Sequence, residues 1–115
     1  MLTVDALEAL GADTKTGLSR CLGNESFYLK FVRMAADQPD FTVLYEAIDN
    51  HDLPRAFEAA HALKGVLGNL SLDFVLNPVL EITELLRSRT EMDYSALVGT
   101  IKEKQQILKD LCEEA

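Results

Sequence analysis

The fold of this chain can be worked out from the stretch AHALKGVLGNL, residues 60–70, which repeats with the period of an α-helix. Leu63, Leu67 and Leu70 recur every three or four positions, so they lie on one side of such a helix. The other side combines an imidazole, an ammonium group and two glycines: His61, Lys64, Gly65 and Gly68. Because each glycine inside a helix costs about 1 kcal/mol relative to alanine, this stripe indicates that open space beside the histidine is useful.

The segments on both sides of this stretch also repeat with helical spacing, and only three prolines and six glycines interrupt them. Asn24 and Asp52 each precede such a segment and are expected to cap it. Pro78 lies inside another segment, so that helix either kinks there or restarts with Asn77 as its cap. The expected helices cover residues 4–10, 14–22, 24–37, 39–49, 52–70, 73–89 and 93–113.

The long helices are joined by short connections at residues 50–52, 71–72 and 88–93, so consecutive ones should lie antiparallel. No segment alternates in the manner of a strand for long enough to compete. The sequence therefore predicts an all-α, up-and-down antiparallel four-helix bundle with short additional N-terminal helices, and a single domain over residues 1–115. The expected core residues are Phe31, Met34, Phe41, Leu44, Val75, Val79, Ile82, Leu86, Leu97, Ile101, Leu108 and Leu111.

The formal net charge of −8 argues against nucleic-acid binding, which needs a basic surface, and against adhesion to an anionic membrane. No segment reaches the roughly 18 consecutive apolar residues of a membrane span, and the first residues do not resemble an export signal. A cytoplasmic location is therefore expected. Cys21 and Cys112 are far apart in the sequence and are expected to be free thiols.

His61 is the candidate reactive residue. The aliphatic side of its helix must face the core, so the imidazole points toward solvent or the rim of the bundle. Imidazole has an unperturbed pKa near 6.5, and a good fraction of it is neutral and nucleophilic at cellular pH. Lys64, one turn further on, can meet negative charge that develops nearby. An exposed nucleophile, a nearby cation and cleared space together suit the acceptance and donation of a phosphoryl group.

Other chemical machinery is not visible in the sequence. No serine or cysteine nucleophile is paired with a base, no glycine-rich loop could hold a nucleotide phosphate, and no acidic or histidine cluster has metal-ligand spacing. We therefore expect a phosphoryl carrier without a cofactor of its own, and not an enzyme. A partner must complete the reaction.

Residues 60–70 resemble the signature of histidine-containing phosphotransfer (HPt) domains, A-H-x-L-K-G-x-x-x-N-L-G. His61 falls on the phosphorylated histidine, and Lys64 on the lysine that follows it. Two residues depart from the pattern. Leu67 replaces a small residue, and its position on the core side indicates that packing absorbs it. Ser71 replaces the usual glycine after Asn-Leu, where serine is less suited to a left-handed cap.

The likeness extends upstream, where GLSRCLGN at residues 17–24, followed by Tyr28 and Phe31, is similar to a second pattern of the family. It covers about residues 17–87. The resemblance implies a four-helix bundle that exchanges phosphoryl groups with receiver domains of response regulators, or takes them from a histidine kinase. It also implies that the receiver supplies the acceptor aspartate and its Mg²⁺. The absence of an exposed heptad seam favours a monomer.

Several residues near His61 have more than one interpretation. Phe57, Gly65 and Gly68 are candidate partner-docking residues, although Phe57 is equally compatible with packing against the preceding short helix. Asn69 is expected to satisfy backbone groups at the helix end. His51 has no cleared space and no adjacent lysine, so it is expected to be a solvated loop residue.

The function expected from the sequence is that of an intermediate in a multistep two-component phosphorelay. His61 would accept a phosphoryl group from a receiver phospho-aspartate or a histidine kinase and pass it to another receiver. One alternative is a helical interaction module that binds receiver or kinase domains without being phosphorylated. Another is a helical enzyme with a histidine base, which would require a deep pocket.

Overall fold

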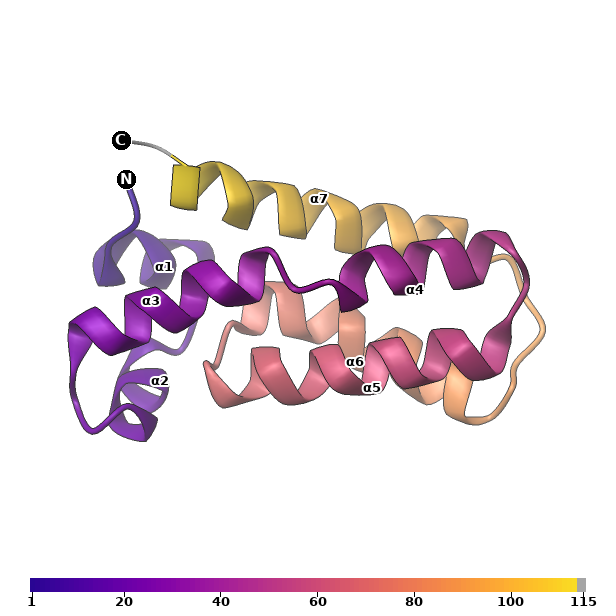
Figure 1. The fold of residues 1–115 in the computed structure, drawn as a ribbon, viewed down its shortest axis with the longest axis horizontal. Helices are drawn as coiled ribbons and strands as arrows, with labels where there is room; N and C mark the ends of the chain where they lie inside the picture. The colour runs from indigo at the N-terminus through magenta and orange to yellow at the C-terminus, as the bar shows by residue number, and fades with distance from the viewer. Residues whose placement is uncertain (114–115) are drawn as a thin grey trace.

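The computed structural model describes residues 1–113, measures 41 × 26 × 20 Å and contains seven α-helices in this range, of which the long ones run back and forth along one axis (Figure 1). The helices are α1 (Val4–Leu10), α2 (Thr14–Arg20), α3 (Glu25–Ala36), α4 (Asp40–Asp49), α5 (Leu53–Asn69), α6 (Asp73–Arg87) and α7 (Ser95–Glu113). All seven expected helices are therefore present, with ends within about two residues of the expected ones.

The long helices form an antiparallel four-helix bundle. α3 and α4 follow each other end to end as one rod, α5 returns beside them, α6 runs forward again and α7 returns (Figure 1). The short helices α1 and α2 lie at one end of the bundle, beside α3. The expected all-α, up-and-down architecture is confirmed.

Side chains of the expected types cap the helices and join their segments. The Asn24 and Asp52 side chains each accept a hydrogen bond from the backbone N–H group of the third residue of the helix that follows, α3 and α5 respectively. The distances are 3.1 and 3.2 Å. The chain breaks between α3 and α4, and Gln105 of α7 bridges this break. Its amide donates to the Ala36 carbonyl at 3.2 Å and accepts from the Tyr45 hydroxyl at 2.8 Å. α6 continues through Pro78, so of the two alternatives for this segment, the restart at Asn77 does not occur.

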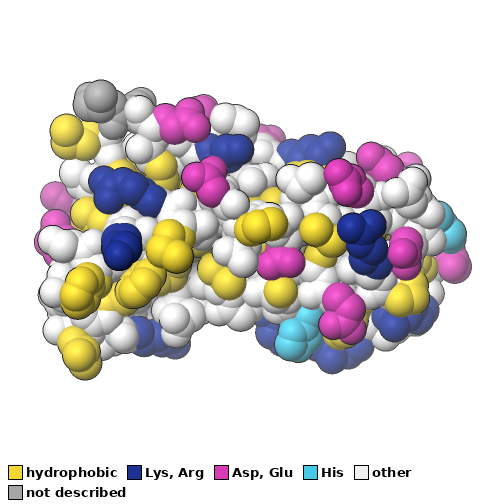
Figure 2. Space-filling model, in the orientation of Figure 1, with side chains coloured by type: hydrophobic (Ala, Val, Ile, Leu, Met, Phe, Trp, Pro, Cys, Tyr) yellow, Lys and Arg dark blue, Asp and Glu magenta, His cyan; other side chains and the backbone are white. Residues whose placement is uncertain are grey.

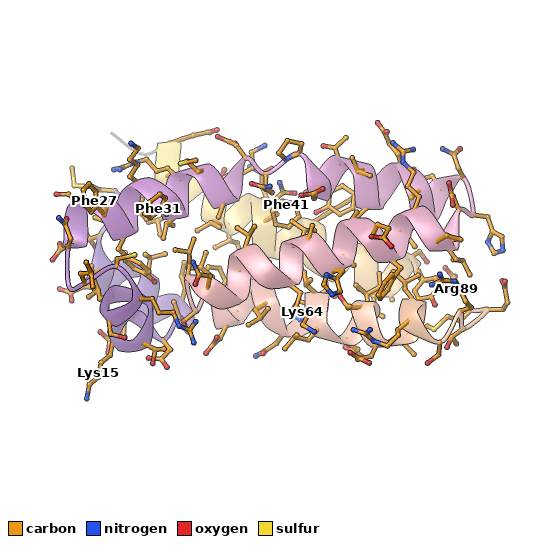
Figure 3. All side chains as sticks on the ribbon, turned by 60° about the horizontal axis from the view of Figure 1, so that its bottom comes forward. Lys15, Phe27, Phe31, Phe41, Lys64 and Arg89 are labelled. Atoms are coloured by element: carbon orange, nitrogen blue, oxygen red, sulfur yellow. The ribbon has the colours of Figure 1, made fainter. Side chains whose placement is uncertain are left out.

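One part of the predicted core is wrong. Phe31 and Met34 are 43 % and 57 % exposed, and Phe27 on the same stripe of α3 is 56 % exposed. Figure 3 shows Phe27 and Phe31 projecting outward from α3, whereas Phe41 points into the bundle. The face of α3 that packs inward consists of smaller or more polar residues: Tyr28, Val32, Ala35 and Ala36. The other expected core residues are buried or half-buried.

Candidate functional site

His61 lies in the middle of α5 with its imidazole exposed to solvent. The helix takes this orientation because its opposite side is buried in the core, where Ala60, Leu63 and Leu67 are fully covered. Leu67, which departs from the HPt signature, is among these core residues, as expected. The long apolar side of α5 thus fixes the direction in which His61 points.

Phe57 contacts the imidazole one turn before His61. The two ring centroids are 5.7 Å apart with an interplanar angle of 60°, which is an edge-to-face arrangement. Phe57 is half-buried, and the guanidinium groups of Arg87 and Arg89 lie over its ring. The ring therefore contacts His61 and the end of α6 and the turn after it, and it also packs against the buried core.

Lys64 lies one turn after His61 and is half-buried (Figure 3). Within residues 1–113, neither the His61 imidazole nor the Lys64 ammonium group forms a hydrogen bond or an ion pair. The stem of such a lysine can lie along the helix while its charged end stays in water. Both groups therefore lack an internal partner among these residues, and the imidazole is open to solvent.

The two glycines beside His61 are not required by packing inside the chain. A Cβ atom added to Gly65 would meet nothing within 4 Å, and one added to Gly68 would only touch Leu76 at 4.0 Å. Gly17 provides a contrast, because a Cβ there would lie 2.5 Å from the Tyr28 ring and 2.6 Å from the Leu70 carbonyl oxygen. Gly65 and Gly68 thus leave open space at the surface, as expected from the sequence.

The upstream residues 17–28 hold the C-terminal end of α5. The Arg20 guanidinium donates to the Gly68 carbonyl and, at 3.4 Å, to the Ser71 hydroxyl. The buried Tyr28 hydroxyl donates to the Leu70 carbonyl at 2.9 Å, and burial raises the pKa of Tyr28 to about 12. These contacts give a structural reason for the upstream pattern, which the sequence alone did not supply.

The structure also tests the predictions for Ser71, Asn69 and His51, which lie at or near helix ends. Ser71 adopts a left-handed φ of +54°, so serine does occupy the position where the signature has glycine. The prediction for Asn69 is wrong: its side chain is exposed and forms no hydrogen bond within residues 1–113, and Arg20 and Tyr28 bind the carbonyls there instead. His51 is an exposed loop residue, as expected, with its imidazole 3.0 Å from the Glu91 carboxylate.

A groove of about 510 Å³ runs between α3 and α5, next to Gly65. Phe31 and Met34 line it on the α3 side, and Gly65 and Val66 line it on the α5 side. His61 is not among the lining residues, so this groove does not provide the deep histidine pocket that a helical enzyme would require.

The described part of the chain contains no group of three histidine, cysteine, aspartate or glutamate residues arranged to hold a metal ion. Among the same residues, no helix is long and apolar enough to cross a membrane. Cys21 and Cys112 are free thiols, as expected.

The sequence matches the Hpt domain over residues 30–115, which is most of the chain and includes α4, α5, α6 and α7 completely. No curated protein and no solved structure matched the chain significantly. Hpt domains are helical phosphocarrier modules of phosphorelays, and in general they interact with receiver domains and kinases. The extent of the match and the helical bundle together show that the chain belongs to the Hpt domain family.

Proposed function

We propose that this chain is an intermediate of a multistep two-component phosphorelay, with His61 as the residue that carries the phosphoryl group. The observation that supports this most strongly is the exposed, unpaired imidazole of His61 at the centre of α5, beside a glycine with open space above it. The match to the Hpt domain supplies the class of reaction. A cytoplasmic location and a monomeric state are part of the proposal.

In the proposed reaction, Nε2 of His61 attacks the phosphorus of an aspartyl phosphate on a receiver domain. The P–N bond forms, the P–O bond to the aspartate breaks, and the receiver recovers its carboxylate. The reverse transfer to a second receiver uses the same atoms. Mg²⁺ is bound by the receiver, and this chain needs no cofactor of its own.

Lys64 is proposed to stabilise negative charge on the transferring phosphoryl oxygens. It lies one turn from His61 and has no recorded partner within residues 1–113. An ammonium group close to a dianionic phosphoryl group contributes a charge-assisted interaction that strengthens as charge accumulates in the transition state. We assign Lys64 to charge stabilisation and not to proton transfer.

The receiver is proposed to dock over Gly65, Gly68 and the neighbouring groove. The exposed apolar stripe of α3 borders this groove, so a partner that reaches His61 can also cover Phe31 and Met34. Yellow apolar side chains gather over α3 in Figure 2. Contiguous exposed apolar surface of this kind is typical of protein–protein interaction sites.

The test is transfer from receiver domains labelled with ³²P-acetyl phosphate to the purified chain. The expected product is a label on the chain that is lost in acid and stable in base, which is characteristic of a phosphohistidine. His61→Gln should abolish it, whereas His51→Gln, at the other exposed histidine, should retain it. A label that persists in His61→Gln would contradict the proposal.

A further inference from the structure

Two arginines and one aromatic ring form a cluster beside His61. The Cζ atoms of Arg87 and Arg89 lie 5.1 and 5.6 Å from the centroid of the Phe57 ring, and the same ring contacts the imidazole. Both distances are within the range of cation–π interactions. The cluster therefore joins the end of α6 and the turn after it to the reactive face of α5.

The arginines are held in place by further contacts. The Arg87 Nε lies 3.3 Å from the Glu84 carboxylate, and the Arg89 guanidinium donates to the Leu86 carbonyl at 2.8 Å. Each guanidinium has five N–H groups, so these contacts leave donors for a partner. Arg89 has a left-handed φ of +53° and forms part of the turn that follows α6.

Basic side chains lie on both sides of His61 along its helix, in a chain whose formal net charge is −8. Lys64 lies on one side of His61 along the helix, and the Arg87 and Arg89 groups lie on the other. Since both guanidinium groups and the imidazole contact the same ring, neither guanidinium can lie much further from the imidazole than one Debye length, which is ~10 Å at 0.1 M salt.

We propose that Arg87 and Arg89, supported by Phe57, form the electrostatic part of the docking surface and bind the acidic rim around the receiver's aspartyl phosphate. This inference rests on the proposed function. The Phe57 ring lies against both the arginines and His61, so the guanidinium groups face the partner beside the reacting atoms. A pair of charges at the rim of an interface increases the rate of association and makes it dependent on salt.

The experiment measures transfer from a ³²P-labelled receiver at several salt concentrations for the single variants Arg87→Ala and Arg89→Ala and for the double variant. KM should rise about threefold for each single variant and about tenfold for the double one, with kcat unchanged. The dependence of kcat/KM on salt should weaken in the double variant. Phe57→Leu, which keeps an apolar side chain without the ring, should also raise KM.

Lys102→Ala is the matched control, because Lys102 lies 5.0 Å over the Tyr45 ring in a second cation–π pair, between α7 and α4. Its removal should leave KM and the salt dependence unchanged. The thermal unfolding midpoint is measured for all variants. An unchanged midpoint shows that a rise in KM comes from weaker docking and not from damage to the end of α6. An unchanged KM and salt dependence in the double variant, or a fall in kcat alone, would overturn the inference.

Phosphoramidate distinguishes this inference from the proposed function. This small donor transfers its phosphoryl group to a histidine with loss of ammonia, and it needs no docking surface. The arginine variants should accept the label from phosphoramidate as fast as the unchanged chain does. If the unchanged chain accepts no label from phosphoramidate or from any receiver, the proposed function is wrong. If the chain accepts the label but the arginine variants leave the KM for the receiver unchanged, only this inference is wrong.

Discussion

At the scale of single residues, the helical glycines of this chain have two different physical roles. Gly17 is required by packing, since a Cβ there would lie within 2.6 Å of the Leu70 carbonyl oxygen. Gly65 is not, since a Cβ there would meet nothing within 4 Å. A glycine inside a helix lowers its stability by roughly 0.5–1 kcal/mol relative to alanine, and at Gly65 no packing contact within the chain requires it. We infer that Gly65 serves the approach of a partner to His61.

Gly65→Ala should therefore stabilise the isolated chain and impair its reaction. The free energy of unfolding in urea should rise by about 0.5–1 kcal/mol, because the helix gains propensity without a clash. Transfer from a phosphorylated receiver should become about tenfold slower, which corresponds to ~1.4 kcal/mol in the transition state. Gly99→Ala is the control, because Gly99 is also helical with open space around it, but lies in α7. It should raise stability to a similar extent and leave transfer unchanged.

Lys64→Ala tests the role of the ammonium group. Transfer should be about tenfold slower, ~1.4 kcal/mol, because a charge-assisted contact to the phosphoryl oxygens is lost. The helical circular dichroism spectrum should not change, since Lys64 forms no recorded ion pair within residues 1–113. Lys64→Arg should restore part of the rate. Equal transfer rates for Lys64→Ala and the unchanged chain would remove the lysine from the mechanism.

At the scale of the helical elements, α5 depends on α2 and α3 for the shape of its C-terminal end. Arg20 and Tyr28 bind carbonyl groups at residues 68 and 70, and Gly17 allows α2 to approach that backbone closely. The carbonyls at the end of a helix need such partners when they are covered by other elements. The position of the groove beside α5 therefore depends on residues within the range 17–28, far upstream of His61 in the sequence.

Gly17→Ala should disrupt this contact between elements. The added Cβ would overlap the Tyr28 ring and the Leu70 carbonyl, so α2 must shift or the Tyr28 hydrogen bond must break. We expect the free energy of unfolding in urea to fall by about 1–3 kcal/mol. Gly23→Ala is a poor control because Gly23 has a positive φ, whereas Gly99→Ala is suitable. An unchanged unfolding midpoint for Gly17→Ala would mean that this packing does not stabilise the chain.

At the scale of the whole molecule, His61 lies between the two surfaces that we propose bind a partner. The apolar stripe of α3 and the groove lie toward one end of α5, and the arginine cluster lies toward the other. His61 is between them on the central helix. A receiver that covers both surfaces would bury apolar area and pair opposite charges at the same time.

Phe31→Ser tests the apolar surface. Because Phe31 is 43 % exposed, the free energy of unfolding should change by less than about 1 kcal/mol, while the KM for a phosphorylated receiver should rise several-fold. Met92→Ser is a matched control, since Met92 is also 43 % exposed but borders a different pocket near Tyr94 and Lys102. Similar KM values for the two variants would show that the receiver does not use the α3 stripe.

Periodicity predicted the helices and the direction of His61 well, because the aliphatic side of α5 leaves only one orientation for the imidazole. It failed on α3, where two apolar stripes compete. The larger residues Phe31 and Met34 were expected inside, but the bundle buries Val32 and Ala35. The partners of Phe57 were also inaccessible to sequence reasoning, since Arg87 and Arg89 come from another element some 30 residues away.

The most direct test of the central claim is to locate the phosphoryl group in the intact chain. The chain is phosphorylated by a labelled receiver, digested at neutral to alkaline pH, and its peptides are fragmented in a mass spectrometer under conditions that keep P–N bonds. We expect one phosphorylated site, at His61, and no modification at His51, which is the other histidine of the chain. A phosphoryl group found at His51 or at any residue other than His61 would contradict this account.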